Sequence, residues 1–243
     1  MEFRAQFFAG IVGYLIWTGV SLLFIEAVFG QVGVVRGWSR EEMWVLYGTY
    51  VALESLCYGL LGPNMFRFSN LVREGGLDLA LTKPVNTQFY VSTRYIDPNG
   101  VMNGLPGIAL LWYGLHRLSL HPSLMQWGLW LALLFCGLVM AYCIWFFCVT
   151  WAIWAVKLEG IAVIFDPMMQ MARFPLEIYP QRLQSFLIFV LPVAFLTTYP
   201  TEALLGKSHP ATLLGALALA AVMLWLTHLF FHFALRFYSS ASS

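Results

Sequence analysis

The stretch from Trp127 to Trp154 reads WGLWLALLFCGLVMAYCIWFFCVTWAIW and contains no charged residue. A helix that crosses a lipid bilayer needs about 20 consecutive, mostly apolar residues. With a rise of about 1.5 Å per residue, this stretch would form a helix about 42 Å long. That length exceeds the hydrocarbon core of a bilayer, which is about 30 Å thick. We therefore predict a transmembrane helix that is tilted or extends beyond the membrane.

The composition of the whole chain agrees with a membrane protein. Its 243 residues are 60% hydrophobic and only 10% charged, and the mean hydropathy is +0.74. A soluble domain carries about 25% charged residues. The composition therefore excludes a soluble enzyme, a disordered chain and a coiled coil. The net charge of +1 indicates no concentrated basic surface for nucleic acid. We predict an all-α integral membrane protein that forms one domain over residues 1–243.

Hydropathy predicts six transmembrane helices. Five of them are Phe7–Phe29, Met43–Leu61, Ile96–His116, Trp127–Trp154 and Ala211–Leu235. The region 157–206 supplies the sixth in one of two ways. Either Leu183–Leu205 crosses the bilayer, or Lys157–Tyr179 crosses and Leu183–Leu205 dips back into the outer leaflet. Both choices put the two termini on the same side. That side carries seven Lys and Arg residues against four to six on the other, which favours cytoplasmic termini.

The long polar loop between the second and third predicted helices is the most informative segment. It covers residues 62–95 and reads GPNMFRFSNLVREGGLDLALTKPVNTQFYVSTRY. Its pattern predicts an amphipathic helix that is capped by Asn64, ends at Gly75-Gly76 and lies along the cytoplasmic membrane face. A second short turn follows and stops at Pro84. The loop could be a simple interfacial anchor or a docking element for a cytoplasmic partner, and the charged turn from Arg73 to Asp78 favours docking.

Several segments resemble one family of bacterial membrane proteins. The hallmark is GGLDLALTKPVNTQFYVS, residues 75–92. Further similarity lies in FPLEIYP at residues 174–180, in VLPVAF at residues 190–195, in TYPTEALLG at residues 198–206, and in EFRA at residues 2–5. Their order and spacing resemble those of the ABC-2-type exporter permeases, the membrane subunits of ATP-driven exporters. The resemblance covers nearly the whole chain.

The resemblance implies how the polar loop is used. In such permeases the first cytoplasmic loop carries a coupling helix that sits in a cleft of the ATPase subunit, and here that helix falls within residues 64–81. Contacts with the ATPase subunit are thereby expected from polar, apolar and turn-forming residues of this segment. These residues are Phe66, Arg67, Phe68, Leu71, Arg73, Glu74, Gly75, Gly76 and Asp78.

The resemblance also implies how the ambiguous region is arranged. Such permeases carry short re-entrant helices on the outer side before the last crossing, so Glu159–Tyr179 is expected to cross and Gln181–Leu205 to be re-entrant. Breaks at Pro180, Pro192 and Pro200 suit broken helices that are covered by protein. Residues expected along the translocation path or at an outer gate are Glu54, Pro175, Tyr179, Pro180, Pro192, Tyr199 and Pro200. Glu54 enters this set because a carboxylate deep in a membrane helix is costly, and it could serve either a structural pairing or translocation.

The sequence has no G-x-x-x-x-G-K-[ST] phosphate loop, so this chain is not expected to hydrolyse ATP. We expect no catalytic, cofactor-binding or metal-binding residue here, because ATP and Mg²⁺ would be bound by a partner. The expected partners are an ATP-binding ABC subunit in two copies, a second permease that is identical or related, and membrane lipids, but no nucleic acid. The expected location is the bacterial plasma (inner) membrane.

The substrate is not specified by any residue pattern, although an uncharged, aromatic-rich membrane region suits a lipid, a lipid-linked glycan or a hydrophobic compound. Two alternatives remain open. One is a non-transporting membrane enzyme or a metal or haem carrier that uses His228 and His232, which lie four positions apart on the last predicted helix. The other is an assembly protein without activity of its own.

Overall fold

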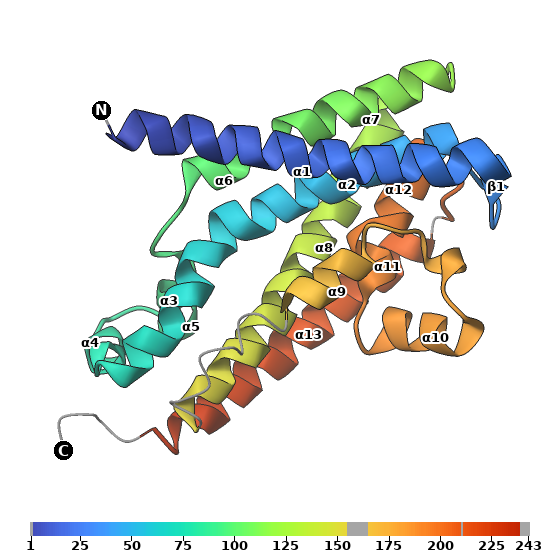
Figure 1. Ribbon diagram of the computed structural model, residues 1–243. Helices are drawn as coiled ribbons and strands as arrows, with labels where there is room; N and C mark the ends of the chain where they lie inside the picture. The colour runs from blue at the N-terminus through green and yellow to red at the C-terminus, as the bar shows by residue number, and fades with distance from the viewer. Residues whose placement is uncertain (1, 155–164, 210, 239–243) are drawn as a thin grey trace.

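The computed structural model describes residues 2–154, 165–209 and 211–238, and nearly all of its elements are helices (Figure 1). A hairpin of two short antiparallel strands pairs Val34 with Ser39 and Val35 with Trp38. The elements in chain order are α1 Glu2–Val32, β1 Val34–Val35, β2 Trp38–Ser39, α2 Arg40–Leu56, the π-helical turn η1 Cys57–Leu61, α3 Gly62–Arg73, α4 Gly76–Leu81, α5 Thr87–Thr93, α6 Pro98–Met102, α7 Leu105–Arg117, α8 Leu124–Thr150, η2 Trp151–Ile153, α9 Phe165–Met171, η4 Leu176–Ile178, α10 Gln181–Phe189, α11 Val193–Leu196, α12 Thr198–Leu204 and α13 Ala211–Leu235.

Four helical segments of the described residues are long and apolar enough to cross a membrane. They are Val12–Val32, Arg40–Arg73, Leu124–Ile153 and Ala211–Leu235. Figure 1 shows the N-terminus, α3–α5 and the end of α13 at one end of the molecule. The β-hairpin lies at the opposite end, as do the starts of α8 and α13. The apolar runs predicted around these four segments are thus confirmed as long helices, and the chain is a multi-pass, all-α membrane protein.

The region before the last helix contains short, broken helices. Helix α10 and the pair α11–α12 together are long and apolar enough for a fifth span, but they are bent by 65°. Such a bend belongs to a broken crossing or a re-entrant loop. Of the predicted crossing Glu159–Tyr179, residues 159–164 lie outside the described part of the chain. Its remainder forms α9 and then the short turn η4.

Two sequence predictions about helix boundaries are wrong. The run Ile96–His116 is not one helix, because residues 103–104 separate α6 from α7. The loop helix does not start anew at Asn64, since the helix from Arg40 continues through η1 to Arg73. Pro63 cannot donate an N–H within this continuous helix. The π-helical turn directly before it, in which the Gly62 N–H bonds the Cys57 carbonyl, absorbs the change of register.

Helices α2 and α7 approach each other through glycine. A methyl group on Gly48 would lie 2.6 Å from the carbonyl oxygen of Gly107, and one on Gly107 would lie 2.6 Å from Val51 Cγ1. Only a residue without a side chain permits this backbone contact, as small residues commonly do between membrane helices. The contact places α7 alongside α2, although α7 is too short to pass as a span by itself.

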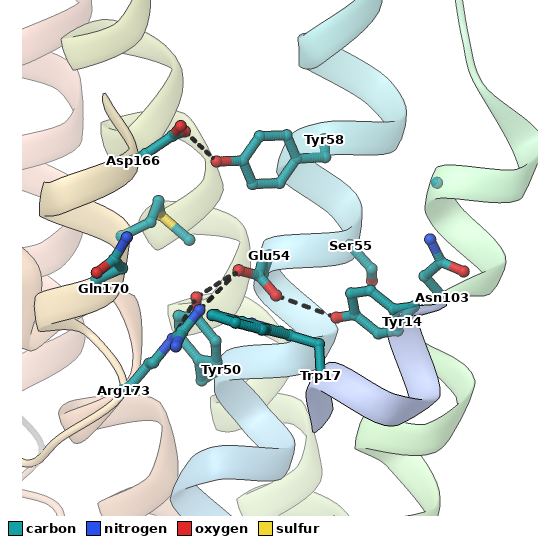
Figure 2. Close-up of a pocket in the computed structure, with 12 residues that line it drawn as sticks. Tyr14, Trp17, Tyr50, Glu54, Ser55, Tyr58, Asn103, Asp166, Gln170 and Arg173 are labelled. Carbon is teal, nitrogen blue, oxygen red and sulfur yellow. Dashed lines mark hydrogen bonds and ion pairs between the residues drawn. The ribbon is translucent and has the colours of Figure 1, made fainter. Parts of the chain in front are cut away.

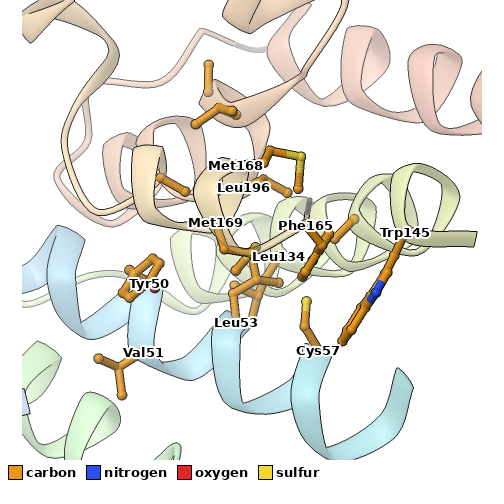
Figure 3. Packing of buried hydrophobic residues seen from close by; sticks show 14 of the residues in the cluster. Tyr50, Val51, Leu53, Cys57, Leu134, Trp145, Phe165, Met168, Met169 and Leu196 are labelled. Carbon is orange, nitrogen blue, oxygen red and sulfur yellow. The ribbon is translucent and has the colours of Figure 1, made fainter. Parts of the chain in front are cut away.

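The buried core lies where α2, α8, α9 and α11 meet (Figure 3). Trp145 of α8 stacks on Phe165 of α9, with ring centroids 4.2 Å apart and planes 4° from parallel. Leu53 of α2 and Cys57 of η1 are fully buried on the same side. This packing fixes the start of α9 against α8 and thereby positions Asp166 on α9 and Arg173 after it.

Candidate functional site

A polar cavity of about 320 Å³ lies between α1, α2, α9 and the turn that follows α6 (Figure 2). Polar groups on membrane-spanning elements are rare, and when present they usually face a cavity or a partner. The lining contains hydroxyl, amide, carboxylate and guanidinium groups together with aromatic rings. Its residues are Tyr14, Trp17, Tyr50, Glu54, Ser55, Tyr58, Gly100, Asn103, Asp166, Met169, Gln170 and Arg173.

Glu54 is the centre of a hydrogen-bonded group in this cavity. Its carboxylate accepts a hydrogen bond from the Tyr14 hydroxyl at 3.1 Å and another from the Tyr50 hydroxyl. The guanidinium of Arg173 lies 3.9 Å from the same carboxylate. Both charged side chains are mostly buried, with 14% of the Glu54 side chain and 17% of the Arg173 side chain exposed. The three partners come from α1, α2 and the segment after α9, so the group ties these elements together.

Arg173 makes further contacts that hold it in place. Its Nε donates a hydrogen bond to the Tyr50 hydroxyl at 3.1 Å. The guanidinium also lies 5.3 Å from the ring centroids of both Trp17 and Tyr50, within the range of cation–π attraction. Sequence analysis found Glu54 but no deep ionisable partner for it. The sequence could not identify Arg173 as that partner, because the pairing depends on how α9 packs.

A second carboxylate lines the cavity on the α9 side. Asp166 accepts a hydrogen bond from the Tyr58 hydroxyl. The Tyr58 ring packs edge-on against Phe165 and Trp145 of the core. The π-helical turn η1 carries Tyr58 and therefore sets where this hydroxyl points. Helix irregularities of this kind are frequent at functional sites.

A neighbouring cavity of about 290 Å³ is mostly apolar. It shares Trp17, Gln170 and Arg173 with the polar cavity. The rest of its lining is Val20, Ser21, Phe24, Ile25, Tyr47 and Phe174. The two cavities are therefore neighbours, and the Arg173–Trp17 contact borders both of them.

The other residues predicted for a path or outer gate lie elsewhere. Glu54 lines the polar cavity, whereas Pro175, Tyr179, Pro180, Pro192, Tyr199 and Pro200 line neither of these two cavities. They shape the broken segment instead. Pro175 and Pro180 precede η4 and α10, and Pro192 precedes α11. Pro200 is buried within α12, the Tyr179 hydroxyl donates to the Met171 carbonyl at 2.9 Å, and the Tyr199 ring packs edge-on against Phe195.

The predicted coupling segment forms a compact unit at the end of the molecule where both termini lie. Asn64 does not cap α3; its side chain instead bonds the backbone of Tyr95, with Nδ2 donating to the carbonyl at 2.7 Å and Oδ1 accepting from the N–H at 2.9 Å. Gly75 has a φ of +71° and separates α3 from α4, which confirms the predicted break. Helix α4 ends at Leu81, before Pro84, also as predicted.

The residues predicted to contact an ATPase differ in exposure. Phe66, Arg67, Arg73 and Glu74 are exposed, while Leu71, Gly75, Gly76 and Asp78 are partly buried. Phe68 is only 2% exposed and packs edge-on against Phe146 and Phe231. In this structure it anchors α3 to α8 and α13. Burial and the nearby Asp78 carboxylate raise the pKa of the Tyr238 hydroxyl, so α4 also lies beside the turn that follows α13.

The histidine pair on α13 is part of a polar contact with α5. His228 Nδ1 lies 3.0 Å from the Gln88 side-chain oxygen, and the His228 and His232 rings are 4.3 Å apart. Gln88 also donates to the Tyr142 hydroxyl at 3.0 Å. Within residues 2–154, 165–209 and 211–238 there is no group of three or more His, Cys, Asp and Glu side chains that could hold a metal ion. His228 is thus accounted for by helix packing.

These features define a multi-pass helical membrane protein with a polar cavity among its helices and a compact segment at one end. Comparison with models of known protein families shows which family the chain belongs to. The model of the ABC-2 family transporter proteins matches residues 15–242, so the chain belongs to this family. It is a membrane transport component of the permease type, which has no ATPase site of its own. No curated protein and no solved structure matches the chain.

Proposed function

We propose that this chain is the permease subunit of an ATP-driven exporter in the bacterial inner membrane. It forms half of the translocation path and couples to a separate ATPase subunit. Its partners are two copies of an ATP-binding ABC subunit and a second permease that is identical or related. Membrane lipids surround it, and its substrate is a lipid, a lipid-linked glycan or a hydrophobic compound. Both termini face the cytoplasm, as the distribution of Lys and Arg favours.

The observation that carries this proposal, beside family membership, is the build of the segment α3–α5. The bonds between Asn64 and Tyr95 close it into one unit, and Phe68 anchors it to α8 and α13. Its surface still exposes apolar side chains, among them Phe66, Leu79 and Val85. Exposed apolar groups beside the charges of Arg73 and Glu74 suit a protein interface. Helix α3 continues from α2 through η1 without a break, so a movement of α3 would also move the residues around Glu54.

The mechanism is alternating access. ATP binding closes the ATPase pair, and the coupling segments move with it. The cavity between two permeases then opens to the outside. The differential affinity of ATP for the closed ATPase state supplies the bias. The broken helices over residues 181–205 act as the re-entrant outer segment, and Pro175, Tyr179, Pro180, Pro192, Tyr199 and Pro200 belong to its gate. No resident cofactor is needed in this chain.

The test is co-purification of the tagged chain from its native membrane in mild detergent, with mass spectrometry of its partners. We expect a subunit with a phosphate loop. The charge reversals Glu74→Arg and Asp78→Arg should lower the recovery of that subunit, whereas Arg117→Glu, an exposed reversal at the end of α7, should not. Repeated purification without any ATPase subunit would refute the proposal. Unchanged recovery with both reversals would refute the docking site alone.

A further inference from the structure

The polar cavity and its apolar neighbour follow one axis along three parts of the chain. On α1 the lining passes from Tyr14 in the polar cavity through the shared Trp17 to Ile25 in the apolar one. On α2 and η1 it passes from Tyr58 to Tyr47. Each of these distances is eleven residues, or about 16 Å of helix. Helix α9 and the segment after it follow the same order, from Asp166 to Phe174.

The chemistry changes sharply along this axis. At one end, Glu54 and Asp166 lie among hydroxyl and amide groups (Figure 2). At the other end the walls are mainly apolar, with Val20, Phe24 and Phe174. A ligand that fills both parts needs a polar headgroup and an apolar tail. Each cavity is close to the lower end of the range for small-molecule sites, about 300 Å³, so each would hold one part of such a ligand.

The position of the axis in the membrane matches a lipid-like orientation. The polar part is nearer the end of the molecule that carries the N-terminus and α3–α5, because Tyr14 precedes Ile25 on α1 and Tyr58 is close to α3. With that end cytoplasmic, as proposed above, the headgroup lies nearer the cytoplasm than the tail does. This is how an amphiphile of the cytoplasmic leaflet is oriented.

The charges of the lining favour a particular headgroup. Among the described residues, the polar cavity contains two carboxylates, Glu54 and Asp166, and one guanidinium, Arg173. Four aromatic residues, Tyr14, Trp17, Tyr50 and Tyr58, add ring faces that attract cations. A cation of the right size would find two acceptors and these rings, whereas an anion would meet both carboxylates in a poorly hydrated site.

We propose that the two cavities together form one binding site for an amphiphile with a positively charged, hydrogen-bond-donating headgroup, which enters from the cytoplasmic leaflet. The headgroup binds beside Glu54 and Asp166, and the tail lies between α1 and Phe174. Arg173 is a positioning residue at the boundary. It holds Glu54 and lies over Trp17, and it must yield part of this contact when the ligand spans both cavities. The inference deepens the proposed function, because it names the substrate class of the exporter.

The experiment measures binding to the permease alone in phosphatidylcholine nanodiscs. Radiolabelled dodecylammonium is the probe, and unlabelled compounds compete with it. Butylammonium lacks most of the tail, dodecanol lacks the charge, and dodecyl phosphate reverses it. We expect dodecylammonium to compete at least about tenfold better than each of the three, a difference of about 1.4 kcal/mol. Empty nanodiscs give the partition of each compound into lipid.

Variants locate the bound probe. Glu54→Gln and Asp166→Asn should each weaken dodecylammonium binding about tenfold. Glu42→Gln is the matched control, because this carboxylate lies on the same helix, outside both cavities, and pairs with Lys207 at 2.7 Å. A dodecylammonium with a diazirine at the tail end should cross-link to residues of the apolar cavity, such as Phe24 or Phe174.

Two results would overturn the inference. One is equal competition by dodecyl phosphate and dodecylammonium, which uses only the native protein and does not depend on a variant that folds. The other is unchanged binding in both carboxylate variants. Because no ATPase is present in this assay, its failure is separate from failure of the exporter proposal. A chain that recruits an ATPase but does not discriminate between these probes refutes only the inference about the ligand.

Discussion

Asn64 and Tyr95 lie 31 positions apart in the sequence, yet the Asn64 side chain makes both hydrogen bonds that the Tyr95 backbone offers, at 2.7 and 2.9 Å. Asn64 is 3% exposed, so these bonds are shielded from water. They join the start of α3 to the segment that leads into α6. The predicted coupling segment is therefore a loop whose two ends are joined.

Replacement of Asn64 by leucine should open this loop. The variant leaves the N–H and carbonyl of Tyr95 without their partners, which costs about 1–3 kcal/mol when the groups stay buried. We expect faster amide hydrogen exchange over residues 64–95 and lower ATPase recovery, with the membrane helices retained. Asn70→Leu is the control, because Asn70 is exposed on the same helix and its side chain accepts a hydrogen bond from the nearby Arg73. Equal rates of amide hydrogen exchange in the two variants would show that the Asn64–Tyr95 hydrogen bonds do not hold the segment closed.

Phe66 and Phe68 should separate the surface of the coupling segment from its anchor. Phe68 is 2% exposed, so Phe68→Ala should lower the free energy of unfolding by about 3 kcal/mol or more. Phe66 is 50% exposed, and its truncation should cost markedly less stability while it weakens ATPase recovery. Thermal unfolding in detergent and co-purification measure the two effects. A larger stability loss at Phe66 than at Phe68 would contradict the placement of α3.

The glycine contact between α2 and α7 should tolerate no side chain. In Gly48→Ala the new methyl group would lie 2.6 Å from the Gly107 carbonyl oxygen and 2.7 Å from the Leu111 nitrogen. These are backbone atoms, so the helices must separate, and overpacking of this kind costs about 1–3 kcal/mol. Gly128→Ala on α8 is the control, because its methyl group would meet nothing within 4 Å and alanine favours a helix. Equal melting temperatures of the two variants would count against the α2–α7 packing.

The sequence alone predicted those parts of the fold that depend on a local pattern of residues. Long apolar runs predicted α1, α8 and α13, and the Gly75-Gly76 pair predicted the end of α3. The sequence did not predict helix boundaries and hydrogen-bond partners that depend on tertiary contacts. The helix continues past Pro63 because a π-helical turn adjusts its register, and no residue pattern marks such a turn. Asn64 resembles a helix cap in sequence, but a backbone distant in the chain takes its hydrogen bonds.

The residues of the candidate site also differ in whether they could be predicted from the sequence. Glu54 could be proposed from the sequence because a carboxylate within an apolar run is costly and needs a reason. Its partner could not, since Arg173 follows a segment whose path was ambiguous between two crossings. The apolar cavity beside it has no sequence signature, because Val20, Phe24 and Phe174 are ordinary apolar residues of a membrane protein until their neighbours are known.

Arg173 and Glu54 should behave as a coupled pair in stability measurements. Loss of one member of a buried ion pair leaves the other charge without compensation, which costs about 3–5 kcal/mol when the pair is fully buried. The side chains here are 17% and 14% exposed and 3.9 Å apart, so we expect about 2 kcal/mol for Arg173→Met. Addition of Glu54→Gln should restore part of that loss, because the remaining group is then neutral. A double-mutant cycle by thermal or denaturant unfolding gives the coupling energy.

Glu26 and Arg40 form the matched exposed pair, at 3.4 Å and with 38% of each side chain exposed, and their cycle should give less than about 1 kcal/mol. Strictly additive losses at Glu54 and Arg173 would show that the two charges do not support each other, and the polar cavity would then lack the link that ties α1, α2 and the segment after α9 together.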